Sequence, residues 1–113
     1  KMLKIFLQVK FRDDPSKGGF LVEDLLESWS KINAINNINL IGLMAIPPIS
    51  LDFNQRKDLF RDCRNLANHL KLKDCSMGMS KDWREAVEAG STWIRVGSLL
   101  FGKRQNLKKL SEL

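Results

Sequence analysis

The sequence predicts an α/β fold with parallel strands, in the order β-α-β-α-β-α-β. Strand-like segments alternate with stretches of helical periodicity, and the connections between them are short. One strand-like segment, Leu40 to Ile46, is apolar throughout, as in a strand covered on both faces. Alternation of this kind is typical of parallel strands joined by right-handed helical crossovers.

Length and composition indicate one domain over residues 1–113, because the chain is 43% hydrophobic and 28% charged. This composition argues against disordered and collagen-like classes, and no apolar run approaches the ~20 residues of a membrane span. Two architectures fit the alternation, an open doubly wound sheet and part of a barrel. A complete (β/α)8 barrel needs roughly 250 residues, so this chain would supply about half of one.

The first elements follow from hydrophobic periodicity. Residues Lys4 to Phe11 alternate between apolar and polar positions and predict a strand, which a Pro- and Gly-containing loop at 13–19 ends. Apolar residues at helical spacing predict helices over Leu21 to Ile35 and Asn54 to Leu70, on either side of the apolar strand at 40–46.

The last elements are shorter and depend more on local signals. Asp74 to Met79 reads as a strand, and Ser80 is a suitable N-cap for a helix over Lys81 to Ala89. Gly90 suits the C′ position of that helix. Thr92 to Val96 then predicts the last strand.

Cysteine and histidine positions predict no metal site and no disulfide. Cys63 falls on the apolar face of a helix and Cys75 at the start of a strand, as expected of reduced core thiols in a cytoplasmic protein. His69 has no Cys or His neighbour at metal-ligand spacing and reads as a surface residue. No signal peptide is visible at the first residues.

Three segments carry candidate binding chemistry. The loop at 76–80 places a glycine and a serine between a strand and a helix, where backbone N–H groups bind anions. Arg95 lies inside a predicted strand, where a cation needs a partner, and Gly97 and Ser98 follow it. In the second half of a barrel these loops would follow strands seven and eight, where barrels commonly bind phosphate.

Each of these segments also has a structural interpretation. Ser80 could simply cap a helix, and Arg95 could form an ion pair at the rim of the sheet. Lys17, in the Ser-Lys-Gly-Gly segment after the first strand, could contact a ligand or lie in a solvated loop. The net charge of +6 suits an anionic ligand or a nucleic acid and does not separate the two.

Five segments resemble, in the same order, the signatures of the pyridoxal phosphate homeostasis (YggS-like) family. They are Leu-Gln-Val at 7–9, Ser-Lys-Gly-Gly at 16–19, Gly-Leu-Met-Ala-Ile-Pro at 42–47, Ser-Met-Gly-Met-Ser at 76–80, and the segment at 90–102. The resemblance covers essentially the whole chain. It implies the C-terminal half of a (β/α)8 TIM-type barrel similar to the N-terminal domain of alanine racemase.

The resemblance also implies a cofactor, pyridoxal 5′-phosphate (PLP), held at the C-terminal ends of the strands. The residues that would hold its phosphate are Ser76, Met77, Ser80, Gly97 and Ser98, with Arg95 near the phosphate or the ring nitrogen. The family's PLP-binding lysine lies in an N-terminal half that this sequence does not include. We therefore expect that half, or self-association, to be needed to complete the barrel. Gln105 and Asn106 stand where the family usually has an aromatic residue, and Cys75 replaces an aliphatic one.

Members of such a family buffer and deliver PLP, which implies a carrier or regulator with PLP-dependent apo-enzymes as partners, no catalytic residues and no enzymatic reaction. One alternative is an alanine-racemase-like PLP enzyme, which would need a second acid/base group, often a Tyr, and this chain has no Tyr. Another is a basic nucleic-acid-binding module, which would need exposed aromatic residues. Trp29 and Trp93 fall on a helix's core face and in a strand, so we expect neither nucleic-acid nor membrane partners.

Overall fold

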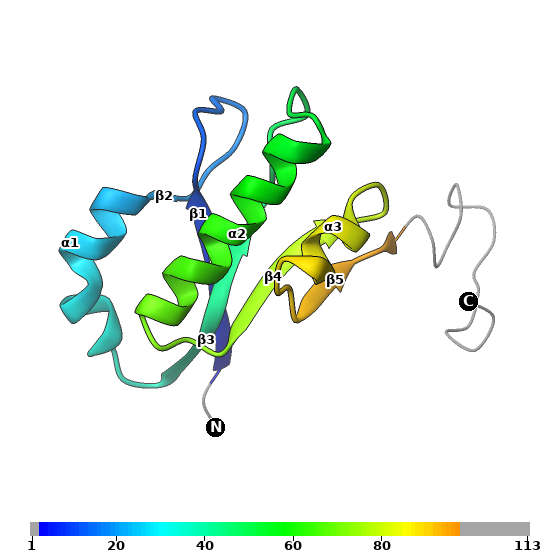
Figure 1. Ribbon diagram of the computed structural model, residues 1–113. Coiled ribbons are helices and arrows are strands. Elements are labelled where there is room, and N and C mark those ends of the chain that lie inside the picture. The colour runs from blue at the N-terminus through cyan, green and yellow to red at the C-terminus, as the bar shows by residue number, and fades with distance from the viewer. Residues whose placement is uncertain (1–2, 98–113) are drawn as a thin grey trace, which may run out of the picture.

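Five parallel strands form one sheet in the computed structural model, which describes residues 3–97 (Figure 1). The order of the strands in the sheet is β2-β1-β3-β4-β5. The elements along the chain are β1 (Leu3–Lys10), β2 (Phe20–Leu21), α1 (Val22–Asn33), β3 (Ile38–Ala45), α2 (Phe53–His69), β4 (Asp74–Met79), α3 (Trp83–Glu88) and β5 (Trp93–Arg95).

The strand order decides between the two predicted architectures. Strands β1, β3, β4 and β5 lie side by side in chain order, without the reversal that a doubly wound sheet requires. Successive right-handed crossovers in one direction place every helix on the same face, and Figure 1 shows the three helices on one side of the sheet. This winding is that of a (β/α) barrel, so the predicted partial barrel is confirmed.

The hydrophobic core fills the space between the sheet and the helices. Alternate residues of β3 and β4 point into it, and Leu43, Cys75 and Met77 are fully buried there. Helix α2 contributes Phe60 and Cys63, both also fully buried. Hydrogen bonding to Cys75 and burial raise the pKa of the Cys63 thiol well above its usual range, so the predicted core thiol stays protonated.

The opposite face of the sheet, which would be the interior of a complete barrel, has no helix against it among the described residues. Phe6 of β1 and Trp93 of β5 meet on this inner face edge to face, with ring centroids 5.8 Å apart. Trp93 is 52% exposed, which is unusual for an aromatic residue in a parallel sheet. The inner face is therefore partly open.

Most predicted boundaries agree with the structure within three residues, and two local predictions are wrong. The third helix begins at Trp83, its N-cap is Asp82, and Ser80 lies in the preceding turn. The short strand β2, at the start of the predicted first helix, was not anticipated; it pairs with the end of β1. Gly90 follows the C-cap of α3 with a φ of 109°, which confirms its predicted C′ role.

Within residues 3–97, no helix combines the length and the apolar character needed to cross a membrane. His69 is exposed near the end of α2, as predicted.

Candidate functional site

A pocket of about 590 Å³ opens where β3 and β4 end. Because the strands are parallel, their carboxyl ends meet at one edge of the sheet, and the loops that follow them gather there. The walls are apolar on the β3 side and polar on the β4 side. The lining residues are Lys17, Ile46, Pro47, Pro48, Ile49, Arg56, Met79, Ser80, Lys81 and Asp82.

The loop after β4 is held by its own hydrogen bonds. The Met79 N–H donates to Oδ1 of Asp82 at 2.7 Å, and the Asp82 N–H donates to the Met79 carbonyl at 3.2 Å. Gly78 precedes this loop with a φ of 100°, and a Cβ there would lie 2.8 Å from the Cβ of Ala86. Only glycine fits this close approach to α3, so the loop conformation is fixed from both sides.

Ser80 lines the pocket within this loop, which places one predicted phosphate ligand at the open edge. Among the described residues, the backbone N–H group of Lys81 makes no hydrogen bond in this turn. An amide N–H beside a serine hydroxyl suits an anion.

Ser76 and Arg95 contact each other across β4 and β5, and neither is among the residues that line the pocket. Nη1 of Arg95 donates to Oγ of Ser76 at 2.8 Å. The Nη2 group of Arg95 is buried and finds no partner among residues 3–97. Burial lowers the pKa of Arg95, and the nearby carboxylate of Asp82 acts in the opposite direction. The predicted need of Arg95 for a partner is therefore only half met.

Met77, Gly97 and Ser98 complete the set of predicted cofactor ligands. The Met77 side chain is fully buried on the helix side of the sheet, and its N–H donates to Oγ of Ser91 at 3.3 Å. Gly97 is exposed, with nothing within 4 Å of the position of a Cβ. Ser98 lies outside the described residues. The structure thus places Ser80 at the pocket, brings Ser76 and Arg95 into contact with each other, and turns the Met77 side chain away.

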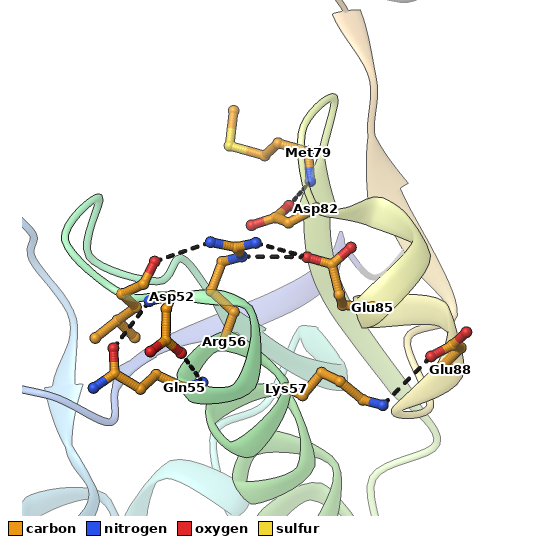
Figure 2. Close-up of polar contacts among 9 residues, drawn as sticks. Asp52, Gln55, Arg56, Lys57, Met79, Asp82, Glu85 and Glu88 are labelled. Carbon is orange, nitrogen blue, oxygen red and sulfur yellow. Dashed lines mark hydrogen bonds and ion pairs between the residues drawn. The ribbon is translucent and has the colours of Figure 1, made fainter.

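Arg56 also lines the pocket, but each nitrogen of its guanidinium makes a hydrogen bond within the fold (Figure 2). Nε and Nη2 donate to Oε2 of Glu85 at 3.2 and 3.1 Å, and Nη1 donates to the Leu51 carbonyl at 2.9 Å. This contact ties the start of α2 to α3. Sequence patterns gave no signal for the pair, because 29 residues separate its members. Arg56 therefore shapes the pocket wall, and its charge is already paired with Glu85.

Lys17 reaches the pocket from the loop after β1. The turn that carries it is closed by Asp14, which accepts hydrogen bonds from the Ser16 hydroxyl at 2.6 Å and the Ser16 N–H at 3.0 Å. The hydroxyl bond contributes most to lowering the pKa of Asp14. Of the two interpretations of Lys17, its position in the lining is compatible with ligand contact.

Ser91 and Thr92 belong to the segment at 90–102 that the sequence singles out, and in the structure they join β4 to β5. Oγ1 of Thr92 accepts from the Cys75 N–H at 2.9 Å. Oγ of Ser91 lies 2.7 Å from the Met77 carbonyl and 2.8 Å from the Trp93 carbonyl. Hydroxyl residues directly after a helix C′ glycine are a weak signal for this role, because such residues are common in loops.

The arrangement can bind an anion, and the described residues give no metal-ligand cluster of three or more His, Cys, Asp or Glu side chains. The Ser80 hydroxyl and the Lys81 N–H lie at the pocket, and a partly satisfied guanidinium lies on the neighbouring strand β5. The pocket volume lies within the range of small-molecule sites.

Comparisons with known proteins agree on the kind of protein. The family model described as "Alanine racemase, N-terminal domain" matches residues 1–105. The pyridoxal phosphate homeostasis protein of Synechocystis is 38% identical over 104 residues, covering 87% of this chain and 48% of that protein. The protein of the same name from Escherichia coli is 31% identical over 112 residues, covering 95% of this chain and 48% of that one.

Solved structures give the same result. PipY of Synechococcus elongatus without PLP superposes with a TM-score of 0.87 at 38% identity, over 90% of this chain and 51% of PipY. PipY with PLP bound superposes with a TM-score of 0.81 at 37% identity, over 88% of this chain and 49% of PipY. The predicted resemblance is thus confirmed, and the chain spans about half the length of the relatives it matches.

Proposed function

Because the chain belongs to the family of the alanine racemase N-terminal domain, we propose that it binds PLP and serves in PLP homeostasis as a carrier or regulator. Its relatives are named as homeostasis proteins, and one structural neighbour holds PLP. In this proposal the phosphate lies between the loop after β4 and the turn after β5.

One observation carries the proposal: the Nη2 group of Arg95 is buried and unpartnered among the described residues. Leaving a buried donor unsatisfied costs about 1–3 kcal/mol, more for a charged group. A fold tolerates such a donor where a ligand satisfies it. An anionic ligand at the carboxyl edge of the sheet would supply the missing acceptor.

The residues present fit PLP. A phosphate ester needs several N–H and O–H donors, and the Lys81 backbone amide, the Ser80 hydroxyl and Nη2 of Arg95 would supply them. Gly97 leaves open space beside the last strand, which allows a ligand to approach the backbone closely. When bound, PLP would bring an aldehyde and a pyridine ring that can act as an electron sink.

Arg95 favours a carrier over an enzyme. An arginine remains charged at neutral pH, so beside a pyridine nitrogen it would oppose protonation of that atom. An unprotonated ring is a weaker electron sink, which disfavours racemisation and transamination. The polar atoms of Arg56 and Glu85 are engaged with each other, which makes both poor acid/base groups.

Binding would be tested by calorimetric titration of the 113-residue chain with PLP, and with pyridoxal as a matched ligand that lacks the phosphate. We expect PLP to bind and pyridoxal to bind at least tenfold more weakly, since the proposed donors address the phosphate. Equal affinity for the two would contradict the phosphate assignment.

The carrier role has its own test. The PLP-loaded chain would be incubated with L-alanine in D2O, and we expect Cα deuteration no faster than with free PLP. Transfer of PLP from the loaded chain to a PLP-dependent apo-enzyme would be followed by the recovery of that enzyme's activity. Rapid deuteration would instead favour the racemase-like alternative.

A further inference from the structure

Among residues 3–97, Asp82 is the one carboxylate that lines the pocket at the end of β4. The other ionisable lining residues are Lys17, Lys81 and Arg56, and the charge of Arg56 is balanced by Glu85. A site that only maximised its affinity for a phosphate ester would not place a negative charge there, because like charges repel within a Debye length. The position of Asp82 therefore needs an explanation.

The first part of the explanation is structural. Asp82 is the N-cap residue of α3, yet its side chain makes no capping hydrogen bond to that helix. It turns back instead, and its Oδ1 accepts the Met79 N–H at 2.7 Å (Figure 2). The side chain thereby closes the turn that contains Ser80 and Lys81. A neutral acceptor of the same shape, such as an asparagine amide oxygen, could make the same bond.

The second part is electrostatic. The carboxylate lies close enough to Arg95 to favour its charged form, against the effect of burial. Met79, which Asp82 binds, is also the register partner of Arg95 across β4 and β5. Asp82 thus offsets part of the positive field of Arg95 and Lys81 at the same edge of the sheet. The Met79 N–H needs an acceptor but not a charged one, so this hydrogen bond does not explain why residue 82 is a carboxylate.

We infer that Asp82 is a positioning residue that holds the loop after β4 and, through its charge, weakens anion binding in the pocket so that a bound phosphate ester can leave. The inference rests on the proposed function and concerns its regulation. A carrier must release its cargo, and affinity differences between related complexes lie mostly in the dissociation rate. The conformation of the loop after β4 needs only an oxygen acceptor at residue 82, whereas the charge of Asp82 sets the affinity for the anion.

The test compares Asp82→Asn with the parent 113-residue chain, using inorganic phosphate, PLP and pyridoxal as probes. We expect the variant to bind phosphate and PLP roughly three- to tenfold more tightly, the effect of one partly screened charge a few ångströms away. Pyridoxal affinity should not change, and the gain should shrink as salt rises. Structural damage does not increase affinity, so a gain separates this role from a merely structural one.

Three further variants complete the design, each checked for folding by circular dichroism. Asp82→Ser is a second neutral acceptor and should also tighten phosphate binding if it folds. Asp82→Ala removes the acceptor as well as the charge and should bind more weakly than Asp82→Asn. Glu27→Gln removes the same charge from an exposed position on α1 and should bind phosphate like the parent.

Each outcome decides a separate question. Suppose that the parent chain prefers PLP to pyridoxal, but that folded Asp82→Asn binds phosphate no more tightly than the parent. The role of Asp82 is then overturned, and the proposed function stands. An equal gain in Glu27→Gln also overturns it, because net charge alone would then explain the result. If no variant and no parent chain binds phosphate or PLP, both the site and the inference are wrong.

Discussion

Replacing Arg95 with methionine should stabilise the fold and weaken PLP binding at the same time. The guanidinium makes one hydrogen bond, to the neutral Ser76 hydroxyl, and its Nη2 group is buried without a partner among the described residues. Burial lowers its pKa, which means that the surroundings disfavour the charge. An unbranched methionine side chain would remove that cost and still fill the space of the apolar stem.

The change in the free energy of unfolding is the difference between one gain and one loss. Removing an unsatisfied buried donor gains about 1–3 kcal/mol, whereas losing the bond to Ser76 costs about 0.5–1.5 kcal/mol. The net gain in the free energy of unfolding is about 1 kcal/mol, or roughly 4–8 °C in Tm for a domain of this size. Loss of a charge-assisted bond worth about 1.5–3 kcal/mol should weaken PLP binding roughly ten- to a hundredfold.

Urea unfolding followed by tryptophan fluorescence and PLP titration would measure both effects. Arg64→Met is the matched control, because every nitrogen of the Arg64 guanidinium donates a hydrogen bond, to Asn68 and to the carbonyls of Leu72, Lys73 and Gly90. That variant should lose stability. Its folded form should bind PLP like the parent. If Arg95→Met is destabilised as much as the control, or binds PLP normally, the guanidinium is structural and does not address the ligand.

Four further predictions rest on separate features. Gly97→Val should fold, because nothing lies within 4 Å of the added Cβ. In titrations it should reduce PLP affinity more than Ser98→Ala, which should cost about 1 kcal/mol of binding free energy. Gly78→Ala should lower the free energy of unfolding by about 2–4 kcal/mol in urea, because a positive φ and a 2.8 Å contact act together; a loss below 1 kcal/mol would contradict the close approach. Cys63 and Cys75 should react with iodoacetamide only on unfolding, and fast alkylation of the native chain would refute their burial. Because the pKa of Cys63 is raised in the fold, the free energy of unfolding should fall as pH rises above the ordinary thiol pKa. The chain alone should self-associate through its open inner face in sedimentation experiments, and a monomer that unfolds sharply at low concentration would exclude this.

Hydrophobic periodicity was sufficient for most of the fold. Alternation and apolar runs located β1, β3, β4 and β5, and the 3.6-residue period located α1 and α2, because each of these elements buries one face against a common core. Strand β2 was missed because it has only two residues, both apolar, directly before a helix. The pattern cannot distinguish them from the first turn of that helix.

The site was only partly predictable, for reasons that are local. Ser76 and Arg95 were identified as a phosphate ligand and as a buried cation in need of a partner, but their contact depends on the register between β4 and β5. Met77 alternates with Ser76 along β4, so its side chain faces the helices. Ser80 resembled an N-cap because a serine precedes a helix there. Asp82 takes that position because the chain first makes a turn.

The register itself explains why Ser91 matters to a site that it does not line. Between the pairs Ser76↔Trp93 and Met79↔Arg95, β4 advances by one residue more than β5, so the backbone ladder between the strands is interrupted. The Ser91 hydroxyl fills this gap, accepting the Met77 N–H and lying within hydrogen-bond distance of the Met77 carbonyl. A bulge of this kind re-aims the side chains beyond it. Arg95 is the next inner-face residue of β5 after Trp93, and its guanidinium turns back to Ser76. The orientation of the proposed anion-binding arginine therefore depends on a serine that satisfies the backbone groups that the bulge leaves unpaired.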